Sequence, residues 1–260
     1  MNARSALLLV TVLGYGVLWV GGVLSYSVMD TSETLQRAAG PAFLWVAAVV
    51  SISTAPGKQR MQIILAAAAA FGVEAVGVAT GMVFGSYRYD AALGLRLLGV
   101  PSAIMAAWLI LLAYVWNLIS RWNLPRAVAA LLGALWMVGI DLVIDPLAAG
   151  PLGFWRWTEP GWYYGIPFSN FAGWYLLSLL LLGLLRSERY YHPPSHVVGW
   201  SIVLFFTLVA GFAGFVLPLA VGAALLLLDG YLYRTRWKGY FGRLNDLLIG
   251  LRRTRRANDG

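Results

Sequence analysis

The sequence contains no cysteine, and only 2 of its 260 residues are histidines. Disulfides, thiolate nucleophiles and cysteine-ligated metals are therefore excluded, and few ligands remain for a histidine-based metal site. Charge is scarce as well, because 12% of the residues are charged and 60% are hydrophobic, against about 25% and 45–50% in soluble domains. The hydrophobic residues come in blocks of about twenty, the length of a helix that crosses a bilayer. This composition excludes an ordinary soluble enzyme, a disordered chain and a secreted disulfide scaffold, and it predicts an all-α, polytopic integral membrane helical bundle.

Eight membrane-spanning helices fit the hydrophobic blocks, although seven would also fit by length alone. The first block exceeds the roughly 7–15 apolar residues of a signal peptide, so we expect a retained span. The last block is too long for one helix, and Gly211, Gly214 and Pro218 near its middle indicate a tight turn between two helices. The predicted spans are residues 6–28, 39–55, 61–83, 101–120, 125–148 and 166–185, with two more within 197–233.

The placement of the basic residues favours eight spans over seven. Lysine and arginine gather in every second connecting segment, and 8 of the 19 lie between Arg234 and Arg256, after the last hydrophobic block. Because cytoplasmic segments are enriched in these residues, both termini are predicted to be cytoplasmic, which requires an even number of spans. We expect one transmembrane domain at residues 1–233 in the cell (inner or plasma) membrane. The basic cytoplasmic tail at 234–260 is expected to contact anionic lipid and no nucleic acid.

Three carboxylates interrupt the predicted spans and are the candidate catalytic residues. Glu74 lies in the third span, whereas Asp141 and Asp145 lie four residues apart in the fifth, on one helical face. An ionisable group costs about 2.5–3.5 kcal/mol at the centre of a membrane helix, so by default it marks a functional site. The alternative is a structural cluster in which Arg88 or Arg156 pairs with the carboxylates. Three carboxylates at similar depth, in the outer half of their helices, favour a catalytic function.

Two loops on the same side of the membrane are rich in aromatic residues, glycine and proline. An aromatic belt at the lipid headgroups would explain the tryptophans and tyrosines. Such a belt would not require the charged residues and the asparagine that lie between them, so we favour a pocket that binds substrate. The candidate substrate-binding residues are Tyr87, Arg88, Trp155, Arg156, Trp157, Glu159, Tyr164 and Asn170.

Two further patterns have structural interpretations. The GxxxG pattern of residues 77–81 predicts close packing between helices and no phosphate-binding loop. His192 and His196 lie in a polar segment with Pro193 and Pro194, where we expect solvated side chains rather than metal ligands.

Between residues 70 and 180 the chain resembles the CruF-type carotenoid 1,2-hydratases, which are integral membrane proteins of carotenoid biosynthesis. The resemblance implies a cofactor-independent hydro-lyase without a metal. It would add water to the terminal 1,2 double bond of an acyclic ψ-end carotenoid such as lycopene, γ-carotene or a C50 precursor. The motifs that carry the resemblance are residues 74–89, Gly99-Val-Pro101, Asp141-Leu-Val-Ile-Asp-Pro146, Phe154-Trp-Arg-Trp-Thr-Glu-Pro-Gly161 and Tyr163-Tyr-Gly-Ile-Pro-Phe-Ser-Asn170.

The candidate residues suit that chemistry, in which a proton adds to the alkene and water captures a tertiary carbocation. Asp141 or Asp145 would donate the proton, a role in which a positioned general acid contributes about 10²–10⁴-fold. The other aspartate, or Glu74, would hold the attacking water, and Asn170 would orient the water or a carboxyl group. The two candidate arginines would tune the carboxylates, and the faces of the loop tryptophans and tyrosines would stabilise the cation.

The residues leave other functions open. The spacing of Asp141 and Asp145 suits Mg²⁺ and prenyl transfer, although no second acidic cluster accompanies them. Cyclisation of a carotenoid end group also begins with protonation of an alkene. A proton-coupled carrier would use intramembrane carboxylates too, although no inverted repeat is visible, and a carotenoid-binding protein would hold pigment unchanged.

The expected partners are membrane lipid, a carotenoid from the bilayer and other enzymes of carotenoid biosynthesis.

Overall fold

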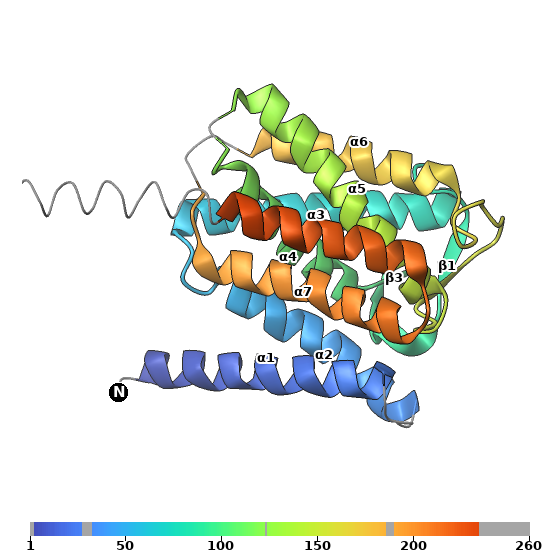
Figure 1. Cartoon of the computed structure of the whole chain (residues 1–260), viewed down its shortest axis with the longest axis horizontal. Coiled ribbons are helices and arrows are strands. Elements are labelled where there is room, and N and C mark those ends of the chain that lie inside the picture. The colour runs from blue at the N-terminus through green and yellow to red at the C-terminus, as the bar shows by residue number, and fades with distance from the viewer. Residues whose placement is uncertain (1–2, 28–32, 123, 186–189, 234–260) are drawn as a thin grey trace, which may run out of the picture.

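Eight α-helices form a bundle in the part of the chain that the structure describes (Figure 1). The structure is a computed structural model, and it describes residues 3–27, 33–122, 124–185 and 190–233. Six of the helices are long and apolar enough to cross a membrane, and the apolar helices Ala38–Ile52 and Phe168–Leu184 are shorter. The predicted all-α polytopic membrane bundle is confirmed. The helices are α1 (Ala3–Ser27), α2 (Glu33–Ile52), α3 (Gly57–Thr80), α4 (Ser102–Ile119), α5 (Arg126–Ala149), α6 (Phe168–Leu184), α7 (Pro193–Phe212) and a last helix, Val216–Tyr233.

Helix α4 lies at the centre of the bundle and α1 at its edge. Nearly every side chain of α4 is buried, because α2, α3, α5 and α7 all pack against it. Helix α1 packs on α2 and α7 and leaves most of its apolar surface exposed (Figure 1). A helix that is apolar all round but exposed on one side suits contact with lipid acyl chains.

Consecutive helices run in opposite directions, so the connecting segments gather at two ends of the bundle (Figure 1). Segments 81–101 and 150–167 lie together at one end, which we call the loop end. The N-terminus and the end of the last helix lie at the other, which we call the opposite end. The even number of helices agrees with the charge argument, whereas the cytoplasmic side of the bundle stays a prediction. The predicted tail at 234–260 lies outside the described residues.

A short antiparallel ribbon joins the two connecting segments of the loop end. Strand β1 (Tyr87–Tyr89) pairs with β4 (Trp155–Trp157), so that Tyr87 lies opposite Trp157 and Arg88 lies opposite Arg156. Because side chains alternate along a strand, Tyr87 and Tyr89 point inward and Arg88 points outward. The first segment also contains the one-turn helix η1 (Ala91–Leu93) and a hairpin of β2 (Arg96–Leu97) and β3 (Val100–Pro101).

The GxxxG glycines serve the loop end and do not bring two helices together. A side chain at Gly77 would meet the Phe84 ring at 2.9 Å, and one at Gly81 would meet Ser86 Oγ at 2.6 Å. Gly81 ends α3 in the left-handed conformation, with φ of 70°, which glycine adopts without steric cost. The prediction of close helix packing at this motif is therefore wrong, because the glycines allow the chain to fold back onto α3.

Candidate functional site

An aspartate pair from α5 shares one amide group from α6. The side-chain nitrogen of Asn170 donates hydrogen bonds to Asp141 Oδ2 at 2.8 Å and to Asp145 Oδ2 at 2.6 Å. All three side chains are buried. The pairing follows from the helix period, which places residues four apart on one face, and from the close packing of α5 on α6. Asn170 stands in the first turn of α6, which begins directly after Pro167.

Glu74 faces the same region from α3, with three donors directed at its carboxyl group. The Tyr87 hydroxyl donates a short hydrogen bond to Oε2, the Tyr89 hydroxyl donates to the same oxygen at 3.3 Å, and Trp108 Nε1 donates to Oε1 at 3.3 Å. The two tyrosines can act together because alternate residues of a strand point to the same side. Burial, and after it the negative charge of Glu74, raises the pKa of both tyrosine hydroxyls. They therefore stay protonated and remain donors.

The three carboxyl groups form one cluster with unused hydrogen-bonding capacity. Glu74 lies close enough to both aspartates for their negative charges to interact. Asp141 Oδ1 is buried without a hydrogen-bond partner among the described residues, and so is Trp157 Nε1. A buried polar atom without a partner costs about 1–3 kcal/mol and points to strain, to a functional role or to a bound molecule. We call Glu74, Asp141, Asp145 and Asn170 the carboxylate cluster.

Four of the predicted substrate-binding residues are charged or exposed and lie outside the carboxylate cluster. Arg156 Nε binds Asp90 Oδ2 at 2.7 Å, and this ion pair is largely exposed. Arg88 and Glu159 are also exposed. Tyr164 is 42% exposed and stacks on Phe215. In the described part of the chain no hydrogen bond or ion pair links either arginine to the cluster, so the alternative in which an arginine pairs with the carboxylates lacks support.

The aromatic residues of the loop end divide into an inner and an outer set. The Trp157 ring lies 4.9 Å from the Tyr87 ring, and Trp155 lies edge-on to Tyr89 at 5.9 Å. Tyr163 is buried and donates a hydrogen bond to the carbonyl of Leu142 at 2.9 Å, and burial raises its pKa to about 12. The outer set, Trp162 and Tyr164, faces the exterior. The inner rings therefore pack against one another and against the bundle, whereas the outer rings are exposed.

Comparison with known proteins identifies the family of the chain. Residues 40–229 match the model of a family described as carotenoid biosynthesis protein. The chain belongs to this carotenoid biosynthesis family. It is also 40% identical, over 111 residues, to a bisanhydrobacterioruberin hydratase of Haloarcula japonica. That alignment covers 41% of this chain and 37% of the relative. No solved structure matches the chain.

The match to the carotenoid biosynthesis family covers every residue of the carboxylate cluster, whereas α1 lies outside it. Two residues that bind or adjoin the cluster were missed in the sequence. Tyr89 could have been found from its place two residues after Tyr87 in a short strand. Trp108 gave a weaker signal, as a tryptophan in the middle of an apolar span whose N–H needs an acceptor. Its ring also stacks on Trp174 at 4.4 Å.

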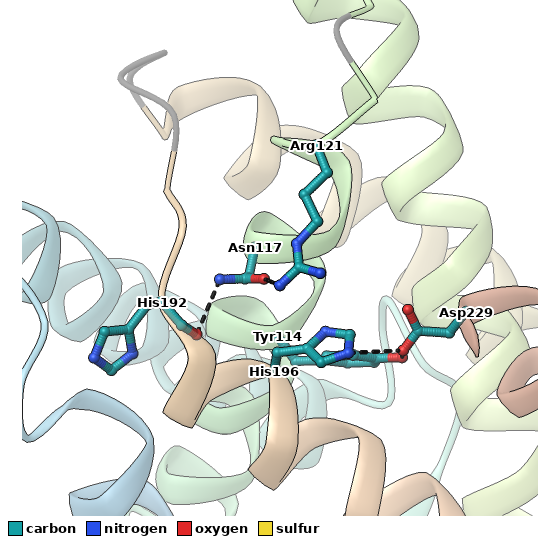
Figure 2. A network of polar contacts seen from close by, with 6 residues as sticks. All are labelled: Tyr114, Asn117, Arg121, His192, His196 and Asp229. Carbon is teal, nitrogen blue, oxygen red and sulfur yellow. Dashed lines mark hydrogen bonds and ion pairs between the residues drawn. The ribbon is translucent and has the colours of Figure 1, made fainter. Parts of the chain in front are cut away.

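A second polar network lies within the region that matches the carotenoid biosynthesis family, at the opposite end of the bundle (Figure 2). The Tyr114 hydroxyl donates to Asp229 Oδ2 at 2.9 Å, and His196 Nε2 lies 3.5 Å from the same oxygen. Asn117 Nδ2 donates to the carbonyl of His192 at 3.0 Å. Asp229 is 1% exposed, and it is an intramembrane carboxylate that the sequence interpretation overlooked.

The expectation of solvated histidines is wrong. His192 caps the first turn of α7, accepts a hydrogen bond from the Ser195 amide and bonds to Thr54 Oγ1 at 2.8 Å. His196 belongs to the helix itself. Proline is favoured at the first position of a helix because its missing N–H would be unpaired there. The two prolines after His192 therefore begin α7 and do not mark a loop.

No group of three histidine, aspartate or glutamate side chains in the described residues is arranged to hold a metal ion. The three carboxyl groups of the cluster are directed at hydroxyl, indole and amide donors. Hydrogen-bond donors of this kind suit acid–base chemistry on a neutral substrate.

Proposed function

We propose that this protein is a carotenoid hydratase that adds water to the terminal 1,2 double bond of an acyclic ψ-end carotenoid. The observation that carries the proposal is the aspartate pair held by Asn170, in which Asp141 keeps one buried oxygen without a partner. The two buried carboxyl groups share one amide, and no cation is bonded to them in the described residues. Burying the pair therefore costs less free energy when it holds a proton than when both groups are charged. The pair therefore acts as the proton donor.

Protonation of the alkene is the difficult step. In the proposed reaction the proton of Asp141 Oδ1 passes to C2 of the end group, and the electron pair of the double bond forms the new C–H bond. The positive charge is then left on C1, which carries two methyl groups. The faces of the Tyr87 and Trp157 rings stabilise this cation without reacting with it. A positioned general acid increases the rate by about 10²–10⁴-fold.

Capture by water completes the reaction. Glu74 Oε2 receives two donors and Oε1 receives one, so Oε1 keeps a free lone pair that can accept a hydrogen bond from water. The water oxygen bonds to C1 and becomes the tertiary hydroxyl group. Its released proton returns to the aspartate pair, which restores the acid, so the reaction consumes one alkene and one water and needs no oxidant or reductant.

The named relative supports the reaction class. A protein named bisanhydrobacterioruberin hydratase is 40% identical to this chain over 111 residues. A long apolar substrate would enter from the lipid, with its end group at the loop end. We predict a location in the cell membrane with both termini in the cytoplasm, which puts the loop end on the outer side.

The test is the mass of the pigments made when the chain is expressed in strains that produce lycopene, γ-carotene or C50 carotenoids. A gain of one water for each reacting end is expected. Unchanged pigment at a normal protein level would refute the proposal. A ring-containing product without oxygen would indicate a cyclase, and loss of activity in a metal chelator would indicate metal-dependent prenyl transfer.

A further inference from the structure

Trp157 of β4 carries a buried N–H group that has no hydrogen-bond partner in the part of the chain that the structure describes. Because side chains alternate along a strand, Trp157 turns inward, opposite Tyr87, while Arg156 turns outward. The N–H group of a buried tryptophan usually has a partner, and leaving it unpaired is costly. We therefore expect a small molecule to bind this group.

The first contact of Trp157 with the carboxylate cluster passes through Tyr87. The centroids of the two rings lie 4.9 Å apart. The hydroxyl group of the same tyrosine donates to Glu74 Oε2 and lies close enough to Asp145 to interact with its negative charge. The indole ring is therefore one side chain away from two of the three carboxyl groups.

The second contact passes through Tyr163. The indole ring packs against the buried group formed by Tyr163, Ile166 and Phe171. The Tyr163 hydroxyl lies close enough to Asp141 to interact with its negative charge. Side-chain contacts thus connect Trp157 to the third carboxyl group as well, and the indole ring belongs to the surroundings of the whole cluster.

The hydrogen-bonding groups around the cluster leave one donor and two acceptors for a bound molecule. The donor is Trp157 Nε1. The acceptors are Glu74 Oε1, which receives one hydrogen bond, and Asp141 Oδ1, which has no partner among the described residues. The other donors are already bonded to a carboxyl group or a backbone carbonyl, and they are the side chains of Tyr87, Tyr89, Trp108, Tyr163 and Asn170.

One donor and two acceptors suit a single water molecule, since a buried water makes about three hydrogen bonds. Its oxygen would accept a bond from Trp157 Nε1, and its hydrogens would be donated to Glu74 Oε1 and Asp141 Oδ1. The aspartate oxygen becomes an acceptor once its proton has passed to the alkene. One lone pair of the water then stays unbonded. A polyene has no polar group and could not pair with these atoms.

We propose that Trp157 is a catalytic residue whose N–H group binds the oxygen of the attacking water, an inference that rests on the proposed function. Held in this way, the water directs its remaining lone pair at C1. Capture competes with another outcome, in which the cation loses a proton from C2 or from a methyl group to the aspartate pair and an alkene forms again. Trp157 thus favours hydration over return to the alkene.

The test removes the N–H group and keeps the aromatic ring. Trp157→Phe does so with a smaller ring, and replacement of Trp157 by its benzothienyl analogue does so with a ring of the same shape, in which sulfur replaces N–H. Trp162→Phe is the matched control, because this tryptophan of the same segment is exposed. The purified full-length proteins convert lycopene in deuterium oxide, and the melting temperature shows that each variant is folded.

Protonation in deuterium oxide places deuterium at C2, so hydrated product reports the captured cations, and deuterium in unhydrated lycopene or its alkene isomer reports those that returned. The ratio of hydrated product to deuterated alkene should fall about three- to tenfold in both Trp157 variants, which corresponds to one lost hydrogen bond. Trp162→Phe should keep the wild-type ratio. Weaker packing or weaker stabilisation of the cation would slow protonation without changing this ratio.

An unchanged ratio in folded Trp157 variants, beside normal hydration by the wild type, would overturn the role of Trp157 and leave the hydratase proposal in place. A wild-type protein that forms no hydrated product would refute the hydratase proposal and the role of Trp157 together.

Discussion

Asn170→Asp is the variant that tests most directly whether the amide of Asn170 bridges the aspartate pair. The substitution keeps the shape of the side chain but replaces the donating NH₂ group with an oxygen. Both hydrogen bonds, at 2.8 Å and 2.6 Å, are lost, and a third carboxyl group faces the first two. A hydrogen bond to a charged group contributes about 1.5–3 kcal/mol. Loss of one such bond in the transition state lowers the rate by about ten- to a hundredfold.

The assay is the rate of lycopene conversion by the purified protein, with the melting temperature as a check of folding. Ser169→Ala is the matched control, because the neighbouring hydroxyl donates to the carbonyl of Phe84 and not to the aspartates. Acid should partly rescue Asn170→Asp, since a protonated carboxyl group can again donate. A folded Asn170→Asp protein that converts lycopene at the wild-type rate would refute the bridging role of Asn170.

Three other substitutions examine the fold around the site. Gly161→Ala should lower the melting temperature by an amount corresponding to about 1–3 kcal/mol or more, because the added carbon would collide with the backbone at Ile166, whereas Gly183→Ala, with open space around it, should not. Asp229→Leu should cost about 1–3 kcal/mol by leaving the buried Tyr114 hydroxyl without its acceptor, with product mass unchanged; a wild-type melting temperature would contradict this. Burial lowers the pKa of His192, so the neutral ring stabilises the fold above the ordinary pKa of about 6.5. This stabilisation should be lost as the pH falls below that value. The melting temperature of His192→Gln should therefore depend less on pH than that of the wild type.

The helices and the position of the carboxylates could be predicted because each depends on a short stretch of sequence. Blocks of about twenty apolar residues match the bilayer, and all eight predicted helices are present. Asp141 and Asp145 share a face because of the helix period alone. Alternating helix directions then place Glu74 at the same end of the bundle as the aspartates.

The partners of the carboxylates could not be predicted, because they depend on contacts between distant segments. The β1–β4 ribbon joins residues that lie more than sixty positions apart, with Arg88 opposite Arg156. Its register turns Tyr87 and Tyr89 toward Glu74 and both arginines outward. A shift of one residue would have reversed these directions, and nothing in either strand alone determines the register.

The opposite end of the bundle shows signals that were present in the sequence, one of them overlooked and one misinterpreted. Asp229 lies four residues before the last described residue, where a charged side chain is expected to reach the membrane surface. Instead it is buried against Tyr114 and His196. The paired prolines before His196 had already indicated the start of a helix, which would have placed this histidine inside the bundle.

The central claim is that Asp141 donates a proton to an alkene that is then captured by water. The most direct measurement is the mass of the product formed from lycopene in water labelled with heavy oxygen, by the purified wild-type protein and by Asp141→Asn. We predict a product with one labelled oxygen for each reacting end from the wild type, and none from a folded Asp141→Asn protein. Labelled product from Asp141→Asn at the wild-type rate, or oxygen in the wild-type product that does not come from water, would contradict the account.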